Sequence, residues 1–369
     1  RNAQMTGGKG PFTKIANNLG KKKPVTKTKL PEFKIEPTVF PVNSFVRTAP
    51  DPETIRMEQR FNELVRKGEE EKIIRAALNF RELGLGIPVL VGRQEKIEDT
   101  LKKIGLRPDT DIEIVNSKDT DKSEEYADFL YKRLQRKGYL RRDCLRMVNN
   151  DRNIFSSCMT SLGHADAMIT GTTRNYSLAL EDITQVIDPI NDKRIVGISA
   201  MVSGPRTVLV ADTNVHDMPS AEEIADIAEA GAELARRLGF VPRVALLAYS
   251  SFGYPEGERS TFMREAVNIL DKRNTNFEYD GEMAADVALN PKAMELYPFC
   301  RLSGPANVLI MPAIHSASIS TKLLQELGGS NLVGPMLVGL SKPIQIIPTG
   351  SRVSEIINLA AIAACDLGR

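Results

Sequence analysis

The sequence predicts an α/β fold with mostly parallel sheets, because short apolar runs alternate with longer segments of helical periodicity along most of the chain. The composition agrees, since 42% hydrophobic and 26% charged residues are typical of a globular protein. With 369 residues the chain is long enough for more than one hydrophobic core. No uncharged apolar run approaches the length of a membrane span, so we expect no membrane association.

Several apolar runs bounded by turn residues are predicted to be strands. They are IPVLVG (87–92), DIEIV (111–115), DAMITG (166–171), IVGISAMV (195–202), RTVLVAD (206–212), RVALLAY (243–249), ANVLIMP (306–312) and KPIQII (342–347). The fourth and fifth of these runs, 195–202 and 206–212, are separated only by a Ser-Gly-Pro turn and are expected to be adjacent.

Segments with apolar residues at helical spacing lie between these runs. They are 69–83, three amphipathic stretches within 126–162, 220–239, 258–273, 316–329 and 354–365. The segment 220–239 carries the strongest boundary signals. Ser220 is the expected N-cap, Glu222 and Glu223 fall in the first turn, and Gly239 marks the end.

Residues 1–50 have a different composition and are predicted to be a basic, flexible linker or tail. Residues 1–35 carry nine Lys or Arg and a single acid, Glu32, whereas the rest of the chain is mildly acidic. A basic tail can bind nucleic acid, but no aromatic interleaving or nucleic-acid motif accompanies this one, which favours a solvated linker. The start lacks an initiator Met and a signal peptide, so we expect a cytoplasmic piece of a longer protein.

The sequence argues against a metal centre and against a nucleotide site within this chain. Its four Cys and three His show no metal-ligand spacing, and no CxxC pair occurs. No GxGxxG follows a strand, and no GxxxxGK[ST] is present.

Polar loops follow several predicted strands, and ligands of open α/β sheets gather at the carboxyl ends of strands. These loops are Thr170–Arg174, Asp212–Asn214, Tyr249–Gly253, Asp280–Glu282 and Pro348–Ser351, the last inside IIPTGSRVSEI (346–356). Small hydroxyls, glycines and an Arg suit a phosphorylated ligand. Each loop taken alone fits ordinary turn and capping chemistry equally well.

The amino-acid sequences of these loops and of the segments beside them resemble those of the phosphate acetyl/butyryltransferase family. The similarity is carried by HADAMITGTTRNYS, VALLAYSSFG, FEYDGEMAADVALN, ANVLIMPAIHSASISTKLLQELGG, VGPMLVGLSKPIQI and SEIINLAAIAA, in order from about residue 69 to 366. YPFCRLSGPANVLIMPAIHSASISTKLLQELGG and DRNIFSSCMTSLG resemble the phosphotransacetylase-like C-terminal half of large bacterial NADP-dependent malic enzymes more than the free-standing transferases.

This resemblance implies two α/β subdomains with a cleft between them, in a phosphotransacetylase-like fold related to isocitrate and isopropylmalate dehydrogenases. Subdomain 1 would comprise residues 51–165 plus 335–369, and subdomain 2 would be inserted as residues 166–334. A homodimer or higher homo-oligomer is also implied. One departure concerns QRFNELVRKG (59–68), which does not look like the apolar first strand of the family.

The resemblance further implies that acetyl-CoA or CoA binds as an effector. The catalytic half of a malic enzyme, which would bring NADP and Mg or Mn, would be a partner in the same polypeptide. The expected acetyl-CoA contacts are Thr172, Arg174, Ser250, Ser251, Phe252, Gly253, Asp280, Glu282, Thr349, Gly350, Ser351 and Arg352.

The phosphate-binding chemistry of active relatives is altered in this chain. Where they have a Ser-Arg-Gly turn followed by Asp, this sequence has Pro348, Thr349, Gly350 and then Glu355, and a second family Arg falls on Glu181. Losing charged hydrogen bonds to phosphate costs about 1.5–3 kcal/mol each. We therefore expect no catalytic residues. The alternatives are an active phosphate acetyltransferase in which Arg174 or Arg352 replaces the lost cations, and a scaffold with a vestigial cleft.

Overall fold

The computed structural model describes residues 62–66, 71–105, 112–118, 120–172, 174–191 and 193–366. The chain separates into two units, Arg1–Pro52 and Glu53–Arg369, and every described residue belongs to the second. The predicted linker of residues 1–50 therefore lies outside the described residues. Among the described helices, none combines the length and the apolar character that crossing a bilayer would require.

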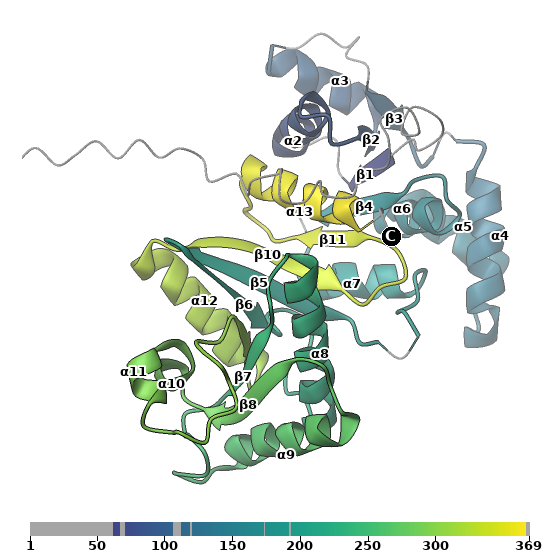
Figure 1. The fold of residues 1–369 in the computed structure, drawn as a ribbon. Coiled ribbons are helices and arrows are strands. Elements are labelled where there is room, and N and C mark those ends of the chain that lie inside the picture. The colour runs from purple at the N-terminus through teal and green to yellow at the C-terminus, as the bar shows by residue number, and fades with distance from the viewer. Residues whose placement is uncertain are drawn as a thin grey trace, which may run out of the picture. The chain divides into compact units, whose positions relative to one another are not determined.

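Two sheets organise the described part of the chain, as the α/β prediction required (Figure 1). The first sheet is parallel throughout and has the order β11-β4-β1-β2-β3. Its strands are β1 (Asn62–Arg66), β2 (Ile87–Val91), β3 (Glu113–Val115), β4 (Ala167–Gly171) and β11 (Ile344–Ile347). The helices that alternate with these strands are α2 (Glu71–Glu82), α3 (Gln94–Lys103), α4 (Ser123–Leu134), η2 (Gln135–Lys137), α5 (Arg141–Asn150), α6 (Arg152–Ser161), α7 (Tyr176–Thr184) and α13 (Val353–Cys365).

The second sheet is mixed and has the order β10-β5-β6-β9-β7-β8. Its strands are β5 (Val196–Ser203), β6 (Arg206–Ala211), β7 (Arg243–Leu247), β8 (Glu278–Met283), β9 (Val308–Ile310) and β10 (Asn331–Val338). The pairs β10–β5 and β5–β6 are antiparallel and the others are parallel. The associated helices are α8 (Ala221–Arg237), α9 (Glu258–Arg273), α10 (Ala285–Leu289), α11 (Pro291–Met294) and α12 (Ile314–Gly328).

Three local expectations need correction. The stretch 59–68 does contain a strand, because β1 at Asn62–Arg66 pairs with both β2 and β4. Strands buried in parallel sheets usually appear as apolar runs, and NELVR does not. Asp280–Glu282 was expected to be a turn but lies inside β8, where Asp, Gly and Glu are unusual strand residues. β10 was not predicted as a strand, because it contains a Gly-Pro pair at 334–335 and both residues are unfavourable inside strands.

The subdomain boundaries stay a prediction, and sheet membership changes close to each of them. β4 was expected in the inserted subdomain beginning at residue 166, but it pairs with β1 and β11 in the first sheet. β10 straddles the predicted return at 335 and pairs with β5 in the second sheet. A buried apolar run does not reveal which sheet it joins, because both of its faces are covered either way.

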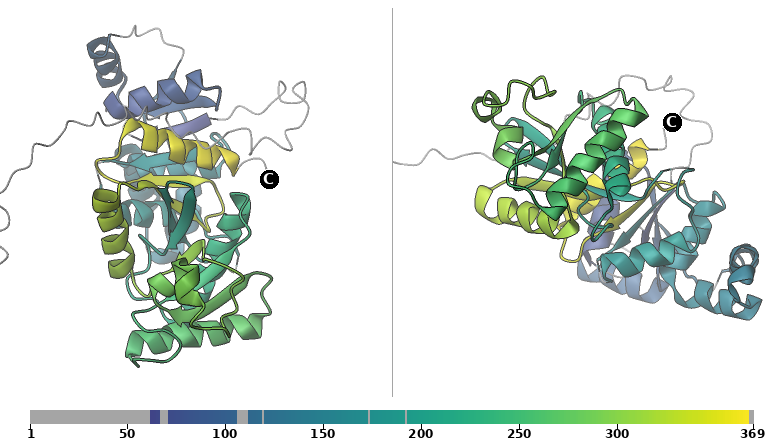
Figure 2. Two further views of the ribbon diagram at one scale, coloured as in Figure 1. Left: turned by 60° about the vertical axis from the view of Figure 1, so that its left-hand side comes forward. Right: turned by 90° about the horizontal axis from the view of Figure 1, so that it is seen from below.

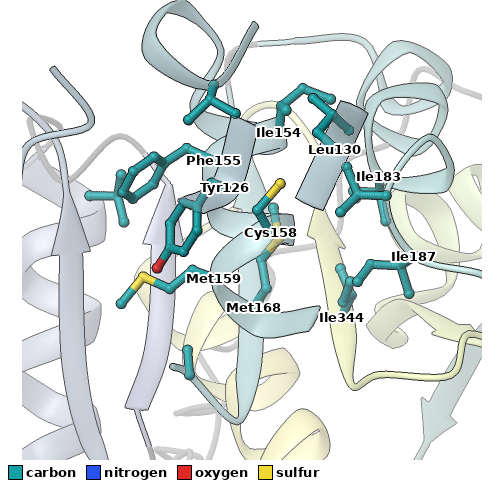
Figure 3. Packing of buried hydrophobic residues seen from close by; sticks show 14 of the residues in the cluster. Tyr126, Leu130, Ile154, Phe155, Cys158, Met159, Met168, Ile183, Ile187 and Ile344 are labelled. Carbon is teal, nitrogen blue, oxygen red and sulfur yellow. The ribbon is translucent and has the colours of Figure 1, made fainter. Parts of the chain in front are cut away.

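The side of the first sheet that carries α4, α5 and α6 holds a large apolar core (Figure 3). The ring of Tyr126 meets that of Phe155 edge-on, with centroids 5.1 Å apart, and its hydroxyl pairs with His164 Nδ1 at 2.9 Å. Leu130 and Cys158 are buried in the same cluster. Burial raises the pKa of the Cys158 thiol to about 12, so this thiol stays protonated at neutral pH.

The helix α8 forms as its boundary signals predicted. Ser220 is the N-cap, its hydroxyl accepts from the backbone N–H of Glu223, and the Glu223 carboxylate accepts from the Ser220 N–H. This capping box satisfies two N–H groups that would otherwise lack partners. Beyond the end of the helix, Gly239 has φ +84°.

Replacing Ser220 with Ala is expected to lower the free energy of unfolding by about 1 kcal/mol, because one of those N–H groups loses its acceptor. Urea unfolding monitored by circular dichroism measures the change. The substitution Ser318→Ala, inside α12, is the control without a cap. Equal losses in the two variants would contradict the capping role.

Candidate functional site

A pocket of about 760 Å³ lies where the turn after β11 meets α12 and the side of the second sheet formed by β10, β5 and β6. Elements of both sheets line it. From the second sheet come Ser199, Thr213, Asn214 and part of β10, from α12 come Ser318, Thr321, Lys322, Gln325 and Glu326, and from the turn come Pro348, Thr349, Gly350, Ser351, Arg352 and Glu355. Hydroxyls and amides dominate this lining, and the charged side chains among these are two cations and two carboxylates.

The turn after β11 is built by local hydrogen bonds. The Ser351 N–H donates to the Pro348 carbonyl at 3.3 Å, and Gly350 adopts φ +90°. Lys72, on α2, donates to the Ser351 carbonyl at 3.4 Å. The turn thus lies at the N-terminus of α13 with Ser351 buried and Arg352 exposed to solvent.

Glu355 forms an ion pair with Arg352 at this turn, although the Arg352 side chain is largely exposed. The Arg352 Nε donates to Glu355 Oε1 at 2.9 Å, and the Arg352 backbone N–H donates to Oε2 at 3.0 Å. Because the carboxylate neutralises the guanidinium, the pair presents little net positive charge to the pocket.

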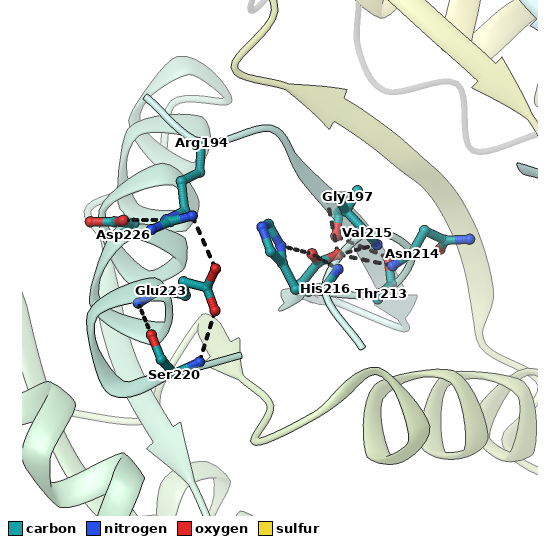
Figure 4. A network of polar contacts seen from close by, with 10 residues as sticks. Arg194, Gly197, Thr213, Asn214, Val215, His216, Ser220, Glu223 and Asp226 are labelled. Carbon is teal, nitrogen blue, oxygen red and sulfur yellow. Dashed lines mark hydrogen bonds and ion pairs between the residues drawn. The ribbon is translucent and has the colours of Figure 1, made fainter. Parts of the chain in front are cut away.

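The loop after β6, which brings Thr213 to the pocket, is fixed by the buried carboxylate of Asp212. Figure 4 shows Gly197, Asn214, Val215 and His216, which surround this carboxylate. Asp212 accepts from the backbone N–H groups of Gly197, Asn214, Val215 and His216 at 2.9–3.2 Å, and it pairs with His216 Nδ1 at 2.6 Å. This fixes the loop that follows β6.

The two hydroxyls that this loop presents are themselves linked. Ser199 Oγ and Thr213 Oγ1 lie 3.0 Å apart, and Thr213 Oγ1 also donates to the Gly197 carbonyl at 3.0 Å. Both hydroxyl groups line the pocket in fixed positions.

Arg174 lies in a second polar cluster. Its Nη1 is 2.7 Å from Asp151 Oδ2 and 2.6 Å from Asp182 Oδ2. Burial alone would lower the pKa of Arg174, but the carboxylates of Asp151 and Asp182 outweigh it, and the pKa lies above its usual value. Asp182 also accepts from Asn153, which is buried against Thr170. Arg174 is therefore already bound by two carboxylates.

The loop Tyr249–Gly253 and the strand β8 form a third cluster, in which polar groups bind one another. Glu282 is fully buried and accepts from Arg264 at 3.0 and 3.1 Å and from the Gly253 N–H at 2.7 Å.

The other predicted residues of this cluster also have partners within the protein. Ser250 donates to Ser260, and Ser251 accepts from the Ala284 N–H. Phe252 packs against Tyr297 and Phe299. Asp280 accepts from the Gly281 and Arg301 N–H groups.

The predicted ligand residues are thus divided among separate places. Of the twelve, Thr349, Gly350, Ser351 and Arg352 line the pocket together with the remnant positions Pro348 and Glu355. The pocket lining does not include Thr172, Arg174, Ser250–Gly253, Asp280 or Glu282. Glu181 is exposed on α7, also outside the lining.

The residues of α12 were missed as site residues, although a signal was present. Ser318, Thr321 and Gln325 follow the spacing i, i+3, i+7 and therefore share one helix face, with Lys322 beside them. Within the described residues no group of three or more His, Cys, Asp or Glu is arranged to hold a metal ion.

Comparison with known proteins agrees with the fold and with the sequence resemblance. A profile described as "Phosphate acetyl/butaryl transferase" matches residues 61–364. The NADP-dependent malic enzyme of Rhizobium meliloti is 58% identical over 303 residues, and that of Escherichia coli 32% over 345 residues. The matches cover 82% and 92% of this chain but only 40% and 44% of those enzymes.

Solved structures give the same result. A phosphotransacetylase from Streptococcus pyogenes superposes with a TM-score of 0.78 at 27% identity, covering 84% of this chain and 94% of that one. The EutD phosphotransacetylase from Staphylococcus aureus gives a TM-score of 0.75 at 25% identity, covering 84% and 94%. With a profile match across 304 residues and relatives well above 30% identity, the chain belongs to the phosphate acetyl/butaryl transferase family.

Proposed function

We propose that this chain is an acetyl-CoA-binding regulatory domain of an NADP-dependent malic enzyme and that it does not itself transfer acetyl groups to phosphate. The family membership supports the acetyl-CoA ligand, and the malic enzyme relatives, of which the chain spans about 40%, support the parent protein.

The observation that carries this proposal is the neutralisation of both arginines that could replace the lost phosphate ligands. Arg352 is bound by Glu355, and Arg174 is bound by Asp151 and Asp182. Phosphate carries close to two negative charges at neutral pH, and an arginine whose charge is already balanced by a carboxylate attracts it less strongly. A Pro348 ring at the turn also offers no hydroxyl.

The pocket suits the acyl-pantetheine part of the ligand. The fixed Ser199 and Thr213 hydroxyls already use their protons, but their free lone pairs can accept hydrogen bonds from the amide N–H groups of pantetheine. Lys322 has no hydrogen bond or ion pair within the described residues and is available to a ligand phosphate. Of the twelve ligand contacts expected from the sequence, we therefore keep the four in the turn, Thr349–Arg352. We add the face of α12 that lines the pocket, with Ser318, Thr321, Lys322 and Gln325.

Regulation follows if acetyl-CoA binds one arrangement of the whole protein more tightly than the other. The catalytic half, with NADP and Mg or Mn, is proposed to lie in the same polypeptide, and the domain is proposed to form a homodimer. Accumulated acetyl-CoA would then inhibit malate oxidation.

The proposal is tested by calorimetric titration of the chain with acetyl-CoA, paired with an assay for acetyl phosphate formation from acetyl-CoA and phosphate. We expect micromolar binding without turnover. Lys322→Met is expected to weaken binding about tenfold, because one charged contact to phosphate is worth about 1.5 kcal/mol. Lys132→Met, on the exposed surface of α4, is the matched control.

Acetyl phosphate formation above background would instead support a working acetyltransferase. An absence of binding in the unaltered chain would remove the ligand proposal and leave a scaffold.

A further inference from the structure

β10 is an edge strand of the second sheet, because β5 is its only partner among the described strands. An edge strand carries backbone N–H and C=O groups that the ladder leaves unpaired. β10 lies between α12 and α13 (Figures 1 and 2), and it contacts both helices. Leu332, Gly334 and Pro335 of this strand line the pocket together with the turn that precedes α13. The outer side of β10 therefore forms a wall of the pocket.

The register of the ladder decides which residues of β10 point outward. On β5, the N–H and the C=O of Gly197 both face the β6 side, where they bond the loop that follows β6. Successive residues of an antiparallel strand turn these groups to opposite sides. Ala200 therefore faces β10, where it pairs with Val333. Leu332, the residue before Val333, consequently turns its N–H and C=O away from β5 and towards the outer edge.

The chain itself closes this outer edge at another position. The buried side-chain amide of Gln345, on β11, bonds both outward groups of Leu337: the Leu337 N–H donates to Oε1 at 2.8 Å, and Nε2 donates to the Leu337 C=O at 3.0 Å. One amide thus satisfies one edge residue. Within the described residues, no partner on the outer side is found for the N–H or the C=O of Leu332. The pocket wall therefore offers one donor and one acceptor to a ligand amide.

The shortness of this free edge indicates which ligand fits. Gly334 and Pro335 lie in a β-bulge, and Pro335 has no N–H. Leu337 is already closed by Gln345. An added peptide strand needs a longer row of free groups, whereas a single amide-bearing unit needs only the two at Leu332. The pantetheine arm of CoA contains such a unit, a β-alanyl group whose N–H and C=O are separated by two methylene groups.

We propose that the outer edge of β10 at Leu332 binds the pantetheine arm of an acyl-CoA. The Leu332 N–H donates to the β-alanyl C=O, and the Leu332 C=O accepts from the β-alanyl N–H. The other amide N–H of the arm donates to the free lone pairs of Ser199 and Thr213. This inference deepens the proposed function and rests on it. Because these contacts are made to the arm, acetyl-CoA and free CoA share them.

The first test follows backbone amide hydrogen exchange of the unaltered chain by NMR, without ligand and with saturating acetyl-CoA. We expect exchange at Leu332 to slow at least about tenfold in the complex, because its N–H gains an acceptor. Leu337, whose N–H is already bonded to Gln345, is the internal control and should change little. Adenosine 3′,5′-bisphosphate, which has the nucleotide phosphates but no pantetheine arm, should leave exchange at Leu332 unchanged.

The second test removes the N–H group. Leu332→Pro should keep the strand pairing, because this N–H lies outside the ladder and proline is tolerated at such edge positions. Leu332→Ala loses the same side-chain packing but keeps the N–H, so it is the matched control. In calorimetric titrations, acetyl-CoA should bind Leu332→Pro at least about fivefold more weakly than Leu332→Ala, with equal urea unfolding midpoints.

The outcomes separate this contact from the function on which it rests. If acetyl-CoA binds but exchange at Leu332 is unchanged, or if the two folded variants bind it equally, the edge contact is overturned and the proposed function stands. Slowed exchange with adenosine 3′,5′-bisphosphate would assign the edge to the nucleotide and overturn the contact as well. If the unaltered chain binds no acetyl-CoA, both proposals fail. If Leu332→Pro does not fold, exchange in the unaltered chain decides.

Discussion

Replacing Gly171 with Ala is expected to lower the free energy of unfolding by about 4 kcal/mol or more, the sum of a strained backbone and an overpacked contact. Gly171 ends β4 with φ +125°, and a Cβ there would lie 2.0 Å from the Ile347 carbonyl oxygen of β11. That atom is backbone in a paired strand, so it has little freedom to move. The turn that follows β11 lines the pocket, so ligand binding should also be lost.

A matched glycine separates the two contributions. Gly163 has φ +78°, but a Cβ there meets no atom within 4 Å. Gly163→Ala should therefore show only the conformational cost of about 1–2 kcal/mol. Urea unfolding of both variants, compared through midpoints at constant slope, measures the difference. If the two losses were equal, the steric contact with Ile347 would not be responsible.

Replacing Glu282 with Gln is expected to cost about 2–3 kcal/mol at neutral pH, because a buried carboxylate loses its charged hydrogen bonds to Arg264 and Gly253. Arg264 is 40% exposed and can be solvated in the variant, which keeps the cost below that of a fully buried pair. Glu256→Gln, at an exposed position of the neighbouring loop, should change stability by less than about 0.5 kcal/mol.

The same carboxylate predicts a dependence on pH. Burial alone would raise the pKa of Glu282, but Arg264 and the backbone N–H of Gly253 outweigh it, and the pKa lies below its ordinary value of 4.5. Because the carboxylate is favoured in the folded chain, its contribution is present above pH 4.5 and is lost as the pH falls through the lowered pKa. Stability between pH 7 and 3 should therefore fall less steeply in Glu282→Gln than in the unaltered chain. Parallel curves would contradict this assignment.

Much of the fold could be predicted locally. The N-cap Ser220 and the stop at Gly239 predicted α8, because capping depends on residues within one turn. β5 and β6 were predicted as neighbours, because the Ser-Gly-Pro turn between them is short. β1 was missed, since Asn62, Glu63 and Arg66 interrupt the apolar run expected of such a strand, and its position between β2 and β4 comes from pairing with distant strands.

The site could be predicted only in part. The turn Thr349–Arg352 was identified because a strand that ends directly before a helix is a local pattern. Ser250 and Glu282 have the same residue types as binding loops, yet in the structure they bind one another and Arg264. Polar residues that contact a ligand and polar residues that bind one another look alike in sequence. Partners far along the chain decide which of the two roles a residue takes.

By itself, the sequence determined the α/β class, the capped helices and the loss of Ser and Arg at Pro348 and Thr349, because these depend on residue type and short spacing. The tertiary structure alone decided that Arg174 and Arg352 are already paired with carboxylates, and that one side of α12 lines a pocket while the other exposes large apolar side chains. These features depend on which distant segments come together, and helical periodicity shows only that a helix has two faces.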